Sequence, residues 1–138
     1  MDDGDRDPNA EILEETSRSG EHFVKVFYQL MDSRRHKLPA LYSPESNFIW
    51  NGSGVRGQNH IAAFLERLPT SVHRLKSLAV QPLLDHDLLI VVVGHVEYTG
   101  RPAQQFQQTF TVRRPRFTST GEKAFIASDA FRFVDGTL

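Results

Sequence analysis

Hydrophobic residues in the first half of the chain recur mostly with the period of a helix. From about Asn9 to Met31 they return every three or four positions, which predicts an amphipathic helix of about twenty residues. Leu38 to Tyr42 reads as a short helical turn. A second helix follows Asn59 and ends before Pro69, because proline cannot continue it. Its apolar face is formed by Ile61, Phe64, Leu65 and Leu68.

The remaining hydrophobic pattern is that of extended strands. Asn51 and Gly52 stand between the runs Asn47 to Trp50 and Val55 to Arg56, and this pair predicts a hairpin because such turns need positive φ. Four long segments then follow one another, which predicts consecutive antiparallel strands packed against the helices in an α+β domain. These segments are Val72 to Pro82, Leu88 to Tyr98, Gln104 to Val112 and Phe125 to Val134.

Two features of the first helix need an explanation. Gly20 lies inside it and costs about 1 kcal/mol relative to alanine, which close packing on a flat surface such as a sheet would explain, as would a mobile first half of the helix. The charged run Asp32 to Lys37 ends the helix, with cations where the helix dipole favours them, and we expect it to be solvated.

Length and composition point to one domain. A chain of 138 residues with 39% hydrophobic content can bury one sizeable core. We expect residues 1 to 8, which carry four Asp, to form a disordered acidic lead-in and residues 9 to 138 to form a single domain. The absence of Cys excludes disulfides, thiolate catalysis and Cys-based zinc sites, and it suits the cytosol or the nucleus.

Charge and hydropathy narrow the choice of partners. The net charge is −1 with both signs interspersed, so no basic patch indicates direct binding of nucleic acid. No apolar run approaches the ~20 residues of a membrane span, and the acidic N-terminus differs from a secretory or mitochondrial leader. We therefore expect a soluble protein whose role in any RNA pathway passes through another protein.

The last predicted strand presents two different faces. Side chains alternate, so Phe125, Phe131 and Phe133 share one face while Arg132 shares the other with small or apolar residues. A guanidinium in such surroundings needs a carboxylate or several acceptors once water is excluded. Another chain could therefore cover this face; alternatively, Arg132 reaches solvent at a sheet edge. The residues placed beside Arg132 are Ile126, Ser128, Ala130 and Val134.

The preceding strand supports a protein-binding face independently. One side of it carries Phe106, Phe110 and Val112, and the other side is polar but uncharged. Loss of charge with retained hydrogen-bonding capacity is typical of the centre of a protein interface, whereas a solvated face would be expected to carry Lys and Glu. The polar side is formed by Gln105, Gln107, Thr109 and Thr111.

An enzyme remains the alternative class. Asp129 stands on the Phe-rich face, where burial would raise its pKa and could make it a general base in a cavity, and His95 and Glu97 share one face of another strand. Asp129 could equally hydrogen-bond backbone groups or cap a helix. We find no metal-ligand spacing, nucleophile elbow or phosphate loop, so no catalytic residue, metal or cofactor is assigned.

Several of these segments, taken in order from about residue 20 to 134, resemble the nuclear transport factor 2-like superfamily, and within it the branch of small mRNA-export cofactors. No single piece is diagnostic, but the ordered set at matching spacing is fairly specific. The segments are Phe23 to Asp32, Leu41-Tyr42, Ile49 to Gly52, Gly57-Gln58, Leu68-Pro69, Gln81-Pro82, Val93-Gly94, Phe106 to Phe110 and Ser128 to Phe133.

The resemblance implies a cone-shaped fold with a strongly curved, mainly antiparallel sheet against three helices. It also implies a heterodimer, through the sheet face, with the related domain of the large mRNA export receptor, in which Arg132 pairs with an Asp of the receptor. Phe-Gly nucleoporins would bind the heterodimer, with this chain in a supporting role. The protein would then shuttle between nucleus and cytoplasm through the nuclear pore.

Departures from the family pattern matter too. The transport factor that carries the small nuclear GTPase has acids in the loop that matches Thr99 to Pro102, whereas this chain has the basic Arg101, so we expect no GTPase binding. Ala79 replaces an Asp found in many relatives, which puts a polar contact in doubt. The superfamily also contains isomerases and dehydratases, so the alternative function is small-molecule turnover by Asp129 in the cone.

Overall fold

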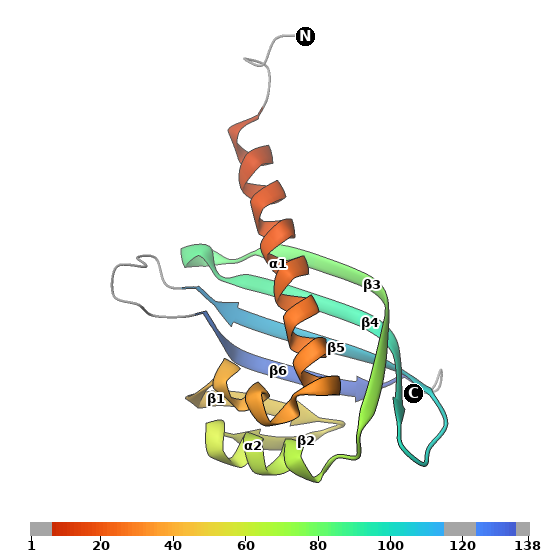
Figure 1. Ribbon diagram of the computed structural model, residues 1–138. Coiled ribbons are helices and arrows are strands. Elements are labelled where there is room, and N and C mark those ends of the chain that lie inside the picture. Colours follow the sequence, from red (N-terminus) through yellow and green to blue (C-terminus); the bar gives the residue numbers. More distant parts are fainter. Residues whose placement is uncertain (1–6, 115–123, 135–138) are drawn as a thin grey trace.

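The computed structural model describes residues 7–114 and 124–134 and shows one curved sheet with helices on its inner side (Figure 1). The element order is α1 (Pro8–Ser33), η2 (Arg35–Leu41), β1 (Tyr42–Trp50), β2 (Ser53–Arg56), α2 (Gln58–Arg67), β3 (Ser71–Pro82), η3 (Leu84–His86), β4 (Leu88–Tyr98), β5 (Gln104–Arg113) and β6 (Phe125–Phe133). The expected α+β class is confirmed. The disordered lead-in was expected over residues 1–8. Residues 1–6 lie outside the described part, whereas Asp7 and Pro8 form the start of α1.

Helix α1 starts one residue earlier than the hydrophobic pattern indicated. Asp7 caps it by accepting a hydrogen bond from the Asn9 amide at 2.9 Å, and Pro8 occupies the first turn, where its missing N–H costs nothing. Gly20 is buried, and a Cβ built on it would lie 2.4 Å from Cγ2 of Val80 on β3. The close-packing explanation of Gly20 is therefore correct.

The charged run Asp32 to Lys37 is solvated only in part. Arg34, His36 and Lys37 are exposed as predicted, but the prediction was wrong for Asp32 and Arg35, which are partly buried and hydrogen-bonded. Arg35 begins the 3₁₀ helix η2 and donates hydrogen bonds to the carbonyl oxygens of Met31, Leu68 and Pro69, the last at 2.7 Å. The Arg35 guanidinium thus joins the end of α1, the start of η2 and the segment between α2 and β3. The pattern could not show this because the acceptors are backbone groups, two of them more than 30 residues away.

The expected hairpin is present between β1 and β2. Trp50 pairs with Ser53, so Asn51 and Gly52 form a two-residue turn with φ of 49° and 92°. Strand β1 begins at Tyr42, however, where the sequence indicated a loop from Ser43 to Ser46. Ser46 explains the difference: it is buried, and its hydroxyl donates to the Ile126 carbonyl of β6 at 2.5 Å, which ties this segment to the sheet.

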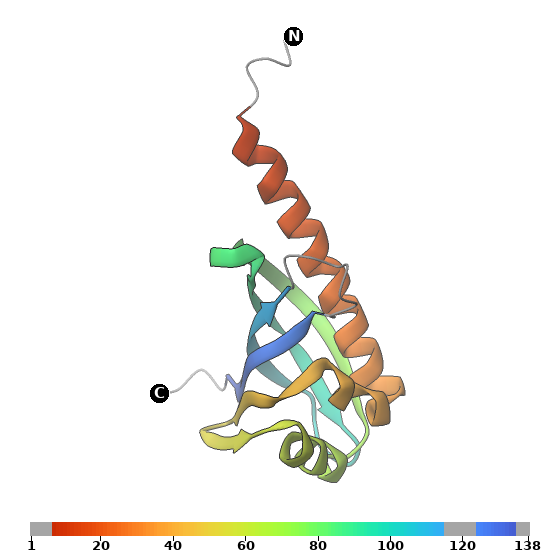
Figure 2. The same ribbon diagram turned by 90° about the vertical axis from the view of Figure 1, so that its left-hand side faces the viewer.

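The sheet is mixed, in the order β2-β1-β6-β5-β4-β3, and only the β1 and β6 pair is parallel. A register shift between Leu75 and Ser77 bends β3 across β4. Gly94 lies opposite this bend, and a Cβ there would come within 2.3 Å of the Arg74 carbonyl oxygen. Figure 2 shows α1 on one side of the curved sheet and the opposite side uncovered. We call the uncovered side the outer face.

Strand β6 departs from simple alternation near its start. Thr111 of β5 pairs with Ser128, but the next residue, Val112, pairs with Ile126, so Ala127 is an extra residue in a bulge. The bulge turns Ile126 into the core, where it is completely buried. Its predicted place beside Arg132 was wrong, because an inserted residue shifts the alternation by one position.

Candidate functional site: the outer face of the sheet

The outer face brings together the polar residues that the sequence singled out. In the pairing of β5 with β6, Gln107 lies opposite Arg132, Thr109 opposite Ala130 and Thr111 opposite Ser128. Arg132 and Ala130 are exposed, and the other four are partly exposed. Gln105 is also partly exposed, and its partner is His95 on β4.

The same face also has an apolar part that the sequence analysis missed. Val93 pairs with Gln107, Val91 with Thr109 and Leu89 with Thr111, so β4 adds a row of partly exposed aliphatic groups. On the other side, Ile49 of β1 pairs with Ala130 and is 48% exposed. The unbroken apolar run from Leu88 to Val93 was the available signal, since a strand that is apolar on both sides is usually covered on both sides.

Arg132 stands in a shallow hollow within this face. The hollow has a volume of about 320 Å³ and is lined by Ile49, Gly52, Gln107, Thr109, Ala130, Phe131 and Arg132. Within the described residues, its guanidinium forms no hydrogen bond or ion pair. A hydrated Arg is stable in the free chain, but a partner that excluded water would have to supply acceptors.

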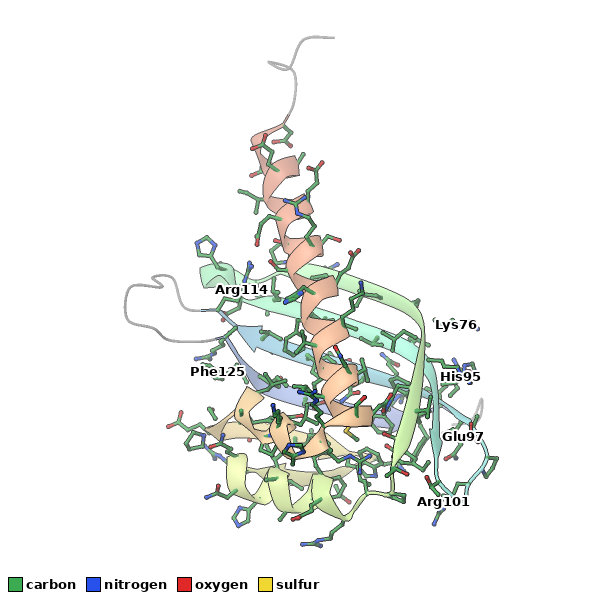
Figure 3. All side chains as sticks on the ribbon, viewed as in Figure 1. Lys76, His95, Glu97, Arg101, Arg114 and Phe125 are labelled. Atoms are coloured by element: carbon green, nitrogen blue, oxygen red, sulfur yellow. The ribbon has the colours of Figure 1, made fainter. Side chains whose placement is uncertain are left out.

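The centre of the outer face carries no acid among the described residues. Ala79, where the family resemblance led us to expect an Asp, pairs with Val91 and adds only a methyl group. The acids on this side lie at its ends: Glu97 near the end of β4, and Asp87, which Arg113 approaches at 3.9 Å, before its start. Figure 3 shows Glu97 and His95 at the right-hand end of the sheet, on the same side of the view as Arg101. Among the described residues, no carboxylate of this chain therefore lies beside Arg132.

Asp129, the candidate general base, lies on the opposite, inner face and is completely enclosed. Tyr42 donates to one carboxyl oxygen at 2.7 Å, and the Gln108 amide donates to the other at 2.8 Å. Tyr28 in turn donates to Gln108 at 2.7 Å. Burial raises the pKa of Asp129 to about 7, although the hydrogen bonds from Gln108 and Tyr42 act in the opposite direction. The partners are side chains, not the backbone groups or helix cap considered from sequence.

The interior beside this network is filled. A cavity of about 10 Å³ remains, lined by residues including Phe27, Trp50, His73, Gln108 and Phe131, which is about the space of one water molecule. His95 and Glu97 lie exposed on the outer face, so the three titratable groups weighed for catalysis are not brought together. No cluster of three or more metal-ligating side chains occurs among the described residues.

A second polar cluster, which no local sequence pattern indicated, lies between α1 and β3. Asp32 accepts hydrogen bonds from the His73 amide and from Ser71, both at 2.8 Å, and contacts Nδ1 of His73 at 2.6 Å. Burial would raise the pKa of Asp32, but the hydrogen bonds and the charge of His73 outweigh it and hold this pKa below its usual value. This cluster fixes the end of α1 on the sheet and lies away from the outer face.

The architecture described above is that of a small cone-shaped α+β domain whose sheet is covered by helices on one side only. The family description "Nuclear transport factor 2 (NTF2) domain" matches residues 19–133, and the chain belongs to this family. None of the helices in the described part of the chain has the apolar length that a membrane crossing needs.

Curated relatives include NTF2-related export protein 1 of Bos taurus, which is 35% identical over 124 residues, 86% of this chain and 88% of that protein. The NTF2-related export protein of Caenorhabditis elegans is 33% identical over 129 residues, covering 88% and 90%. Among solved structures, NTF2 from Cryptosporidium parvum has a TM-score of 0.78 at 23% identity, covering 87% of this chain and 95% of that one. The Candida albicans Mtr2–Mex67 M domain complex has a TM-score of 0.71 at 18% identity, covering 86% and 94%.

Proposed function

We propose that this protein is a non-enzymatic cofactor of nuclear mRNA export, which forms a heterodimer through its outer face with the NTF2-like domain of the large mRNA export receptor. The observation that carries the proposal is Arg132, which has no hydrogen-bond or ion-pair partner among the described residues and stands on a half-apolar sheet face whose described part has no acid at its centre. The names of the relatives in cattle and nematode support the pathway. A solved complex of Mtr2 with the Mex67 M domain, which shares the fold, supports assembly with a second protein.

The groups around Arg132 are a mixture of apolar and neutral polar side chains. The apolar area comes from the aliphatic side chains of Ile49, Leu89, Val91 and Val93. Neutral hydrogen-bonding groups come from Gln105, Gln107, Thr109, Thr111 and Ser128. The small side chain of Ala130 allows a second sheet to approach closely. A face of this kind resembles the centre of an interface. Once it is covered, a bidentate carboxylate is the best partner for Arg132.

Removal of the Arg132 guanidinium should therefore greatly weaken binding of the receptor domain. Truncating one member of a buried charged pair costs on the order of 2–5 kcal/mol, which corresponds to roughly thirty- to several-thousand-fold in affinity at about 1.4 kcal/mol per decade. We expect Arg132→Ala to fold normally, since the side chain contacts solvent in the free chain. The variant should no longer bind the receptor domain. Arg132→Asp should be rescued by an Asp→Arg change in the partner.

The experiment compares both variants and the swapped pair by pull-down and calorimetry. Arg101→Ala is the matched control, because Arg101 is an exposed arginine in the turn between β4 and β5 (Figure 3). Undiminished binding by Arg132→Ala, with Arg101→Ala also binding, would return Arg132 to the role of a solvated residue and remove the basis of the proposal.

The proposal extends to the nuclear pore. The heterodimer would bind Phe-Gly nucleoporins weakly, with the receptor's domain as the main site and this chain stabilising it, and the complex would shuttle between nucleus and cytoplasm. No direct contact with nucleic acid or membrane is proposed. Repeat binding by the isolated chain with the affinity of the heterodimer would contradict the supporting role.

Binding of the small nuclear GTPase is not proposed. The turn that would have to carry acids, Thr99 to Pro102, presents the exposed Arg101 instead, and Gly100 adopts a φ of 86° to form it. Catalytic turnover is not proposed either, since both oxygens of Asp129 are engaged and only about 10 Å³ remains in the neighbouring cavity.

A further inference from the structure

The turn between β3 and β4 displays two leucines at the end of the sheet. Leu84 is 89% exposed, more than any other large hydrophobic residue in the described part of the chain, and Leu83 is 41% exposed. Single exposed aliphatic residues are common on protein surfaces and need no explanation by themselves. The position of this turn and the way it is held distinguish Leu84.

The turn continues the outer face. Ala79 and Gln81 lie on the outer side of β3, opposite Val91 and Leu89, and Leu83 comes next in the same alternation. The Leu83 amide donates to the Asp87 carbonyl at 2.7 Å, which carries the pairing one step past the ends of both strands. Figure 2 shows the η3 turn standing out on the side of the sheet away from α1. A partner lying on the outer face would therefore meet Leu83 and then Leu84.

Arg114 holds this turn in place. Its Nε donates to the His86 carbonyl at 2.7 Å, while its Nη1 donates to Glu15 at 2.9 Å and to Ser19 at 3.1 Å on α1. Figure 3 shows Arg114 between the turn and the helix. One guanidinium thus fixes the leucine-bearing turn to the main helix before any partner arrives. Ordering in advance reduces the entropy that binding has to offset.

We infer that Leu84 is a second anchor for the same partner domain that covers the outer face, and that it enters an apolar recess at the rim of that domain. The inference rests on the proposed function. A single Leu contributes only about ten- to a hundredfold to a binding constant, too little to hold a separate partner. The turn must therefore belong to a larger contact surface, and the outer face is the one continuous with it.

The test measures the affinity of the full chain for the NTF2-like domain of the receptor by calorimetry, and the dissociation rate by surface binding. Leu84→Ser should weaken binding about ten- to a hundredfold and speed dissociation, with no change in the melting temperature of the free chain. Leu75→Ser is the matched control: Leu75 is a 43% exposed leucine at the bend of β3, and its replacement should leave affinity unchanged.

Arg114→Ala provides a second readout. If Arg114 acts by ordering the turn, its replacement weakens binding in the unmodified chain but adds little in a Leu84→Ser background, which a double-mutant cycle measures. Fully additive losses would show that Arg114 does not act through Leu84 and would contradict this part of the inference.

The outcomes separate the two proposals. Normal binding by Leu84→Ser, together with lost binding by Arg132→Ala, would overturn the role of Leu84 and leave the heterodimer intact. Self-association of the free chain that Leu84→Ser abolishes would also overturn it, because the occupant would be a second copy. If the unmodified chain does not bind the receptor domain, the proposed function fails and this inference fails with it.

Discussion

Gly20 of α1 lies so close to Val80 of β3 that no side chain fits between helix and sheet. A Cβ at position 20 would stand 2.4 Å from Cγ2 of Val80 and 2.6 Å from its Cγ1. This contact sets the height of α1 above the sheet. It also explains why a helix of 26 residues keeps a glycine that lowers its intrinsic stability.

Gly20→Ala should destabilise the protein although alanine favours helices. The gain in helix propensity is about 1 kcal/mol, while overpacking of a tight contact costs about 1–3 kcal/mol. We expect a lower midpoint in chemical denaturation. Adding Val80→Ala should recover part of the loss attributable to the clash, which a double-mutant cycle detects. Ser17→Ala on the exposed side of α1 is the control and should be neutral or stabilising.

Arg35→Lys should destabilise the fold by about 1–3 kcal/mol. A lysine keeps the charge but cannot reach the carbonyl oxygens of Met31, Leu68 and Pro69 together, because it lacks the planar fork. Denaturant unfolding of this variant should be compared with that of Arg34→Lys, whose side chain is exposed. Equal midpoints for the two variants would show that the Arg35 contacts add nothing to stability.

The raised pKa of Asp129 predicts that the folded protein loses stability as pH rises. Its pKa is about 7 in the folded protein and 3.8 in an unfolded chain, so between these values the folded state binds the extra proton. The free energy of unfolding should then fall by up to about 1.4 kcal/mol per pH unit as pH rises from about 4 to 7, and level off above that.

Asp129→Asn should remove this component, because an amide can still hydrogen-bond to Tyr42 and Gln108 but does not titrate. We therefore expect the variant to be more stable than the unmodified chain at pH 8, by less at pH 5, and to keep binding the receptor domain. An Asn variant with the pH profile of the unmodified chain would show that another group is responsible. Turnover of a small apolar ligand that the Asn variant loses would instead favour the enzyme class.

The lowered pKa of Asp32 predicts the opposite dependence of stability on pH. Its pKa is lowered in the folded protein, so its contribution is fully present above the unfolded value of 3.8 and is lost as pH falls through the folded value. Asp32→Asn should destabilise at pH 7 by about 1–3 kcal/mol, and the difference from the unmodified chain should shrink in acid. Glu66→Gln is the control, because it removes an exposed carboxylate outside this cluster.

Most helices, strands and turns could be predicted from the sequence because they depend on local residue preferences and on hydrophobic periodicity. The turn at Asn51 and Gly52 has the positive φ that these residues favour, and the alternation in Gln104 to Val112 matches the burial observed along β5. The outer positions of Gln107, Thr109 and Arg132 follow from the same alternation.

Contacts between segments that are distant in the chain could not be predicted from the sequence. The bulge at Ala127 reverses Ile126, but it is visible only in the pairing of β6 with β5. The acceptors of Arg35 are carbonyl groups, which every residue has, so no residue type marks them. The roles of Asp32 and His73 depend on α1 crossing β3, a packing relationship that the two local patterns leave open.

The place of β6 in the sheet also affects how the protein is made. Strand β1 joins β3, β4 and β5 only through β6, which is inserted between β1 and β5 although it is the last strand in the described part of the chain. During synthesis, the β1 and β2 hairpin and the three-stranded piece therefore emerge from the ribosome as unjoined parts, each with an open edge. Strand edges of this kind are prone to pairing with other chains. A nascent chain of this protein therefore stays vulnerable to aggregation until β6 has been translated, and a premature stop before Phe125 would leave it permanently in that condition.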